Sequence, residues 1–215
     1  MKESYFTPET IQDVSGEIIR KLAPYQRMVR IPFIPERSAL LILDMQEVFL
    51  NKYSHAYIPS APVIVHNINT LSEAFHRNNF PVIITRHVNT EHNAGMMKAW
   101  WNTLIDAEYK GSDLIESIDT VDCKIIEKTQ YDAFYRTELN DFLLDNNIEQ
   151  LVVTGVMTHL CCESTVRSAF VRGFTVFFPV DGTATYNLDF HMSTCRNLSH
   201  GFAICTLCKK MTEQI

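Results

Sequence analysis

LVVTGVMTHLCCESTVRSAFVR, residues 151–172, decides the fold of this chain and indicates its chemistry. The apolar run 151–154 predicts a buried strand that ends in a turn at Gly155. Six residues after this glycine, Cys161 stands where the pattern predicts the start of a helix. Unpaired N–H groups and the positive end of the helix dipole stabilise negative charge at such a place. We therefore expect a lowered thiol pKa and a nucleophilic thiolate.

The same alternation of apolar strand and helix continues on both sides of this stretch. Short apolar strands that alternate with helices form a parallel sheet covered on both faces. The expected fold class is α/β, with a central, mainly parallel six-stranded sheet in one domain over residues 38–215. Residues 1–37, which include Pro24, Pro32 and Pro35, are expected to form a helical and extended arm. The predicted strands are 38–43, 81–85, 124–127, 150–154, 174–178 and 203–207, and the main predicted helices are 62–78, 137–146, 159–172 and 189–201.

Composition and charge exclude several classes of function. Of the 215 residues, 46% are hydrophobic and 20% are charged, as in ordinary globular proteins. The formal net charge of −6, without a basic run, argues against a nucleic-acid or anionic-membrane partner. No segment approaches the roughly 18 apolar residues of a membrane span, and the first residues, MKESYFTPET, lack the apolar region of a signal peptide. We expect a cytoplasmic protein.

Three ionisable residues follow three of the predicted strands. Asp44 follows the first strand, Lys128 the third and Cys161 the fourth. Parallel strands bring their carboxyl ends to one edge of a sheet, where α/β proteins bind ligands, so these side chains are expected to converge. Asp44 would take the thiol proton and pass it to a leaving group, and Lys128 would hold both partners by its charge. The alternative for each residue alone is a solvated loop position.

Three sequence blocks connect the chain with a known family. LLILDMQ (40–46), KTQYDAF (128–134) and GVMTHLCCEST (155–165) closely resemble the isochorismatase-like cysteine hydrolases, which include nicotinamidases, N-carbamoylsarcosine and ureidoacrylate amidohydrolases and isochorismatases. The resemblance covers residues 37–207. It implies a Rossmann-like three-layer α/β/α sandwich and a catalytic triad of Asp44, Lys128 and Cys161. It also implies a small-molecule substrate, no cofactor, and a homo-oligomer, either a dimer or a tetramer.

The resemblance also assigns roles around the nucleophile. The family spacing of six residues from the turn glycine selects Cys161 rather than Cys162, which we expect to be a small buried residue. The family carries a non-proline cis peptide bond that would fall between Val156 and Met157. The resemblance then places the oxyanion hole at the backbone N–H groups of Met157 and Cys161.

The chain differs from two subfamilies at the positions that bind the metal or the substrate. Nicotinamidases hold a metal with an Asp-x-His pair after the second strand, where this chain has His87 and Asn89. We therefore expect no metal, and His87 is expected to line the substrate pocket. The glutamine near His87 and the arginine further on, with which isochorismatases bind their substrate carboxylates, have no counterparts at matching positions.

Aromatic residues are the expected walls of the pocket. The segment MMKAWWNTLI, residues 96–105, is the predicted lid or wall. Adjacent residues of a helix face different ways, so one of the two tryptophans reaches the site, and we assign Trp100 to it. Tyr131 and Phe134 follow Lys128 and are assigned to the same pocket, where aromatic walls favour a planar or apolar group.

The function predicted from these observations is hydrolysis of a small amide or related C–N bond through a thioester intermediate. Two alternatives remain open at this point. One is a vinyl-ether hydrolase of the isochorismatase type, which uses Asp44 as an acid and needs no thiol. The other is a non-catalytic binding module on the same fold.

Overall fold

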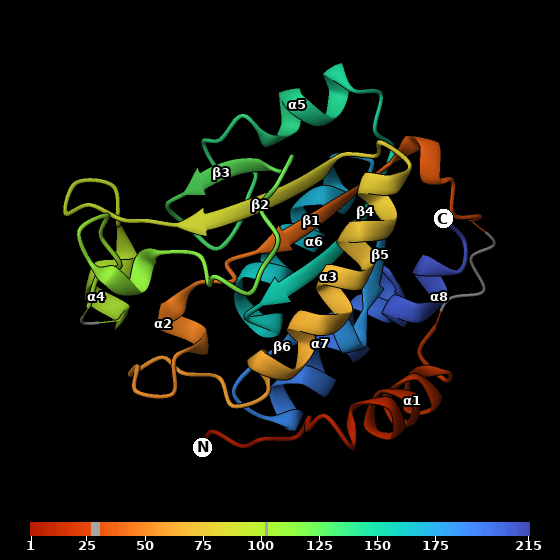
Figure 1. The fold of residues 1–215 in the computed structure, drawn as a ribbon, viewed down its shortest axis with the longest axis horizontal. Helices are drawn as coiled ribbons and strands as arrows, with labels where there is room; N and C mark the ends of the chain where they lie inside the picture. The colour runs from red at the N-terminus through yellow and green to blue at the C-terminus, as the bar shows by residue number, and fades with distance from the viewer. Residues whose placement is uncertain (27–30, 102) are drawn as a thin grey trace.

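The computed structural model describes residues 1–26, 31–101 and 103–215, which form three layers (Figure 1). The central layer is a seven-stranded parallel sheet with strand order β3-β2-β1-β4-β5-β7, and the short β6 pairs with β4. Helix α3 crosses one face of the sheet and α6 lies on the other. The predicted α/β/α sandwich is confirmed. The strands are β1 (Ser38–Leu43), β2 (Val82–His87), β3 (Lys124–Lys128), β4 (Gln150–Val156), β5 (Thr175–Pro179), β6 (Thr183–Ala184) and β7 (Ile204–Thr206).

The six predicted strands all occur, with ends shifted by one or two residues. The predicted number of six is wrong, because the two-residue β6 pairs with the end of β4 and is too short to leave a pattern. Strand order reverses between β1 and β4, since β2 and β3 lie on the far side of β1. Ligand sites of such sheets lie beyond the strand ends at this reversal.

The helices bury one face each against the sheet or against one another. In α3 the apolar residues Ile64, Ile68, Leu71 and Phe75 recur every three or four positions and are all buried. The helix predicted over 159–172 begins only at Glu163, because residues Thr158–Cys162 form a π-helical turn. The helices are α1 (Ile11–Leu22), α2 (Glu47–Leu50), α3 (Ala61–Arg77), α4 (Met96–Trp101), α5 (Leu139–Asp145), α6 (Glu163–Val171), α7 (Leu188–Gly201) and α8 (Cys208–Thr212).

The core is continuous from β1 to the N-terminal residues. Every residue of β1 is buried, as its unbroken apolar sequence predicts. The N-terminal segment contributes Phe6, and α1 contributes Ile18 and Leu22, to the same apolar cluster. None of the helices in the described part of the chain is long and apolar enough to cross a membrane.

Candidate active site

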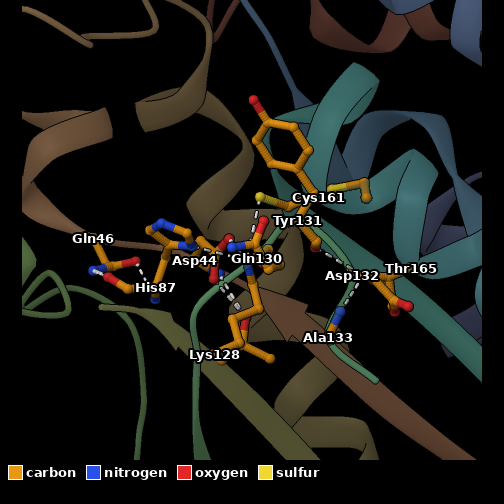
Figure 2. Close-up of polar contacts among 12 residues, drawn as sticks. Asp44, Gln46, His87, Lys128, Gln130, Tyr131, Asp132, Ala133, Cys161 and Thr165 are labelled. Atoms are coloured by element: carbon orange, nitrogen blue, oxygen red, sulfur yellow. Dashed lines mark hydrogen bonds and ion pairs between the residues drawn. The ribbon is translucent and has the colours of Figure 1, made fainter. Parts of the chain in front are cut away.

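The three residues singled out at strand ends lie in contact. Lys128 Nζ is 2.7 Å from Asp44 Oδ2 and 3.3 Å from Cys161 Sγ. Figure 2 shows the ammonium group between the carboxylate and the sulfur. Asp44 and Lys128 expose no surface, and Cys161 is 6% exposed. The edge of the sheet thus brings a base, a cation and a thiol to one point.

Asp44 is held by its own backbone and by β2. Its φ of +53° lies in the left-handed region that few non-glycine residues adopt, and such residues concentrate at functional sites. The Thr85 hydroxyl donates to Asp44 Oδ1 at 2.6 Å and accepts from the Asp44 backbone N–H at 3.2 Å. Among the described residues, Oδ2 has no polar partner besides the Lys128 ammonium. This oxygen can therefore accept a further proton.

Lys128 remains an ammonium ion although it is fully buried. Burial by itself lowers a lysine pKa, but the adjacent Asp44 carboxylate and Cys161 sulfur more than offset it, so the Lys128 pKa is raised. Its Nζ also donates to the backbone oxygen of Gln130 at 2.9 Å. The ammonium is therefore fixed in direction by several acceptors.

The Cys161 thiol behaves differently from the sequence-based expectation. Burial raises its pKa to about 12, and the charge of Lys128, which acts in the opposite direction, does not compensate. The expected lowering of this pKa is wrong, because the sulfur is enclosed and sits in a π-helical turn that precedes α6. The resting site therefore holds a neutral thiol beside an Asp44–Lys128 ion pair, and nucleophilic attack requires a base for the thiol proton.

The turn before Cys161 depends on a close approach of β4 to β1. Gly155 has a φ of +102°, and a Cβ atom there would stand 2.1 Å from the backbone oxygen of Leu43. Only glycine fits this position. One residue after this glycine, the peptide bond between Val156 and Met157 is cis, as the family resemblance predicts.

His87 completes the polar surroundings of Lys128. The Asn89 amide nitrogen donates to the Thr129 backbone oxygen at 2.7 Å, so Asn89 Oδ1, 2.7 Å from His87 Nε2, accepts from the ring. His87 Nδ1 is then the unprotonated nitrogen and faces Lys128 Nζ at 3.4 Å. Burial, with the charge of Lys128, lowers the His87 pKa to about 4, so the ring is neutral.

Gln46 is a functional residue that the sequence reasoning did not assign. Its side chain accepts from the His87 backbone N–H at 2.8 Å and donates to the His87 backbone oxygen at 3.0 Å. It therefore fixes the end of β2 and with it the His87 ring. The signal in the sequence that could have identified Gln46 is its position two residues after Asp44, within LLILDMQ.

A cavity of about 200 Å³ opens over the Cys161 sulfur. Its wall combines apolar and uncharged polar side chains from six segments of the chain. Of the residues predicted to line it, His87 and Tyr131 do so. Thr165 of α6 holds the Tyr131 loop by accepting from the Ala133 backbone N–H at 3.0 Å (Figure 2). The lining residues are Phe49, His55, Ala56, His87, Asn89, Met97, Trp101, Thr103, Ile105, Tyr131, Met157, Leu160, Cys161 and Tyr186.

Two pocket predictions need correction. Trp100 is 71% exposed and lies outside the cavity lining, whereas Trp101, the next residue on α4, lines it and donates to the Tyr131 hydroxyl at 2.6 Å. Phe134 is also outside the lining, since its ring is buried and stacks on Phe174. Residues 129–136 form turns rather than a helix, so a spacing of three does not keep Phe134 on the face of Tyr131.

A comparison with protein families identifies the family of the chain. The model of the isochorismatase domain matches residues 38–209, which include all three sequence blocks. The chain belongs to the isochorismatase family. The resemblance inferred from those blocks is confirmed.

Relatives of this isochorismatase-family chain include several named hydrolases. Nicotinamidase 3 of Arabidopsis thaliana is 37% identical over 186 residues, which cover 83% of this chain and 88% of that protein. Enterobactin synthase component B of Escherichia coli (strain K12) is 26% identical over 174 residues, covering 80% of this chain and 61% of that protein. A crystal structure of a cysteine hydrolase from Pseudomonas syringae pv. phaseolicola 1448A has a TM-score of 0.84 at 24% identity, covers 88% of this chain and 97% of that one, and shows the shared fold. The protein is a hydrolase, as predicted.

The residues at the nicotinamidase metal position do not suit a metal in this family member. Both ring nitrogens of His87 are engaged, one with Asn89 and the other facing the Lys128 ammonium, whose charge repels a cation. Within the described ranges, no three His, Cys, Asp or Glu side chains are grouped to hold a metal ion. We derive no chemical step through a metal.

Proposed function

We propose that this isochorismatase-family hydrolase cleaves the C–N bond of a small, uncharged amide, with Cys161 as the nucleophile. The observation that carries the proposal is the contact of Lys128 with both Asp44 and Cys161, whose sulfur lies at the cavity. A base, a fixed cation and a thiol at one point are what acyl transfer to sulfur requires.

The proposed reaction proceeds in two halves. Asp44 takes the thiol proton while the sulfur attacks the amide carbonyl carbon, and Asp44 then gives this proton to the nitrogen as the C–N bond breaks. Ammonia or an amine leaves, and a thioester remains on Cys161. A water molecule, deprotonated by Asp44, attacks the thioester, releases the carboxylic acid and returns the proton to the sulfur.

Two groups stabilise charge in this proposal. The Lys128 ammonium pairs with the Asp44 carboxylate before attack and balances the charge that develops on sulfur. The backbone N–H groups of Met157 and Cys161 form the oxyanion hole for the tetrahedral intermediate. The position of both residues next to the cis peptide bond and the π-helical turn supports this assignment.

The cavity wall supports an uncharged substrate with a planar or apolar acyl group. None of the described lining residues is Lys, Arg, Asp or Glu. Isochorismate, which carries carboxylates, would bury them here without a cation, because Lys128 is already paired with Asp44. The similarity to Nicotinamidase 3 also favours an amide over the vinyl-ether alternative.

The adjacent cysteines provide the test. The wild type, Cys161→Ala and Cys162→Ala are assayed for ammonia release from a panel of neutral primary amides, with isochorismate as the competing substrate. Rapid quenching and mass spectrometry then search for an acyl adduct. Cys161→Ala should lose turnover and the adduct, whereas Cys162→Ala, whose sulfur is buried outside the cavity lining, should keep both. Turnover that survives Cys161→Ala but not Asp44→Asn would instead establish the thiol-independent chemistry.

Three further properties of the enzyme concern its cofactor, its location and its assembly. We propose that the enzyme needs no cofactor, that it acts in the cytoplasm on a small molecule, and that it assembles as a homodimer or homotetramer. Retained turnover after dialysis against a chelator tests the first, and sedimentation velocity tests the last.

A further inference from the structure

The first residues of the chain are fastened to one wall of the cavity. The Glu3 backbone N–H donates to the Tyr186 backbone oxygen at 2.8 Å, and the Glu3 carboxylate accepts from the Leu188 N–H at 2.7 Å. The Asn187 side chain donates to the backbone oxygen of Met1 at 3.1 Å. Tyr186 is a lining residue of the cavity. The N-terminal segment thus holds the loop between β6 and α7 on which this tyrosine lies.

The same segment reaches a second wall, on the loop before α3. Lys2 Nζ donates to the backbone oxygen of His55 and lies 4.6 Å from the ring centroid of Tyr186. Both His55 and Tyr186 line the cavity, although they are far apart in the sequence. The backbone N–H groups of Tyr5 and Phe6 donate to the Ser60 hydroxyl at 3.0 and 3.1 Å. Residues 1–6 therefore join the loop before α3 to the loop between β6 and α7.

Tyr5 extends this connection to the turn that carries the nucleophile. Its hydroxyl accepts from the Thr185 N–H at 3.0 Å and lies 3.0 Å from Nδ1 of His191. Burial raises the Tyr5 pKa and lowers the His191 pKa to about 3, so a protonated tyrosine donates to a neutral imidazole. The Thr158 hydroxyl is 3.2 Å from the same Nδ1. Thr158 begins the π-helical turn that contains Cys161.

We propose that residues 1–6 form a clasp on the active site, in which Tyr5 positions the Cys161 turn and Lys2 sets the spacing of His55 and Tyr186. The clasp lies outside residues 38–209, the part that matches the family domain. Loops lose conformational freedom when they are tied, and a tied wall presents the substrate to the nucleophile in one geometry. The role in turnover rests on the proposed amidase function.

The first test separates positioning from stability with Tyr5→Phe. This change removes the hydroxyl and keeps the ring, which packs at 4.6 Å from Phe6 and 5.3 Å from His191 between centroids. We expect kcat to fall about ten-fold with KM unchanged, because small displacements of a nucleophile lower turnover strongly. The rate of iodoacetamide labelling at Cys161, mapped by mass spectrometry, should change by more than about three-fold, since one lost hydrogen bond is worth about 1 kcal/mol. Labelling needs no substrate, so this readout stands even if the amidase proposal fails. The matched control Tyr135→Phe, on an exposed ring, should leave kcat and labelling unchanged.

The second test uses the exposed Lys2, whose replacement does not endanger folding. Lys2→Met keeps the apolar stem and should raise KM about five-fold with kcat unchanged, because a cation over an aromatic ring is worth about 1 kcal/mol. Lys2→Arg should restore KM, and Lys209→Met, on an 84% exposed side chain, is the control. Wild-type KM in Lys2→Met, together with wild-type kcat and labelling in Tyr5→Phe, would overturn the proposal and leave the segment a purely structural role.

Discussion

The Nζ atom of Lys128 lies 2.7 Å from Oδ2 of Asp44, and neither side chain exposes any surface to solvent. Removing one member of a buried ion pair leaves an uncompensated charge, which typically destabilises a protein by about 3–5 kcal/mol. We therefore expect Lys128→Met to lower the free energy of unfolding by about this amount. Urea unfolding at neutral pH measures the loss.

A second variant separates this electrostatic effect from loss of packing. Asp44→Asn combined with Lys128→Met removes both charges and should recover most of the lost stability while turnover stays abolished. The coupling energy from the two single variants and the double variant should therefore be large. Simple additivity of the two single effects would show that the pair does not act as one unit.

The adjacent tryptophans of α4 give a matched pair for substrate binding. Trp101→Phe removes the hydrogen bond to the Tyr131 hydroxyl across the cavity, worth about 1 kcal/mol, and should raise KM about five-fold. Trp100→Phe changes an exposed ring outside the lining and should leave KM within about two-fold of the wild type. Steady-state kinetics on one neutral amide compares them. An equal change of KM in the two variants would contradict the assignment of Trp101, rather than Trp100, to the cavity wall.

Two buried histidines make stability depend on pH. The pKa of His87 is lowered to about 4 and that of His191 to about 3, mainly by burial, whereas an unfolded histidine titrates near 6.5. Below about pH 6.5 these two histidines bind protons in the unfolded chain but not in the native state. The stabilisation is therefore present above this pH and is lost as the pH falls toward 4, by up to about 1.4 kcal/mol per pH unit for each histidine. His191→Asn, which keeps an acceptor for the Tyr5 hydroxyl, should lower the slope of unfolding free energy against pH between 6 and 5. An unchanged slope would mean that His191 takes up a proton in the native state.

The sequence predicted the centre of the sheet well because strands β1 and β4 are buried on both faces. Runs such as SALLIL and LVVT have no polar alternation, so a parallel sheet was the available arrangement. The convergence of Asp44, Lys128 and Cys161 at one edge followed from that predicted sheet, and no side-chain contact had to be known. β6 escaped prediction because a two-residue pairing depends on where β4 already lies.

The pocket was predicted less well, since more than half of its lining residues lie in loops rather than in periodic elements. His55 and Tyr186 enter the cavity from turns whose position depends on the N-terminal segment, and nothing in their local sequence indicates this. The Cys161 pKa was predicted in the wrong direction for a related reason: the helix dipole is readable from sequence, but the extent of burial is not.

The glycine that ends β4 provides a test of how the nucleophile turn is built. At Gly155, an added Cβ meets the Leu43 backbone oxygen at 2.1 Å, and backbone in a central strand pair cannot move aside. Gly173 also has a positive φ, +93°, but an added Cβ there meets nothing within 4 Å. Both alanine variants carry the strain of a left-handed backbone, about 1–2 kcal/mol, so their difference isolates the close approach. Gly173→Ala should fold and keep its turnover, whereas Gly155→Ala should lose several kcal/mol of stability or separate β4 from β1 and lose turnover. Thermal unfolding and ammonia release measured on both variants compare the two positions, and equal stability would show that the contact between Gly155 and Leu43 can relax.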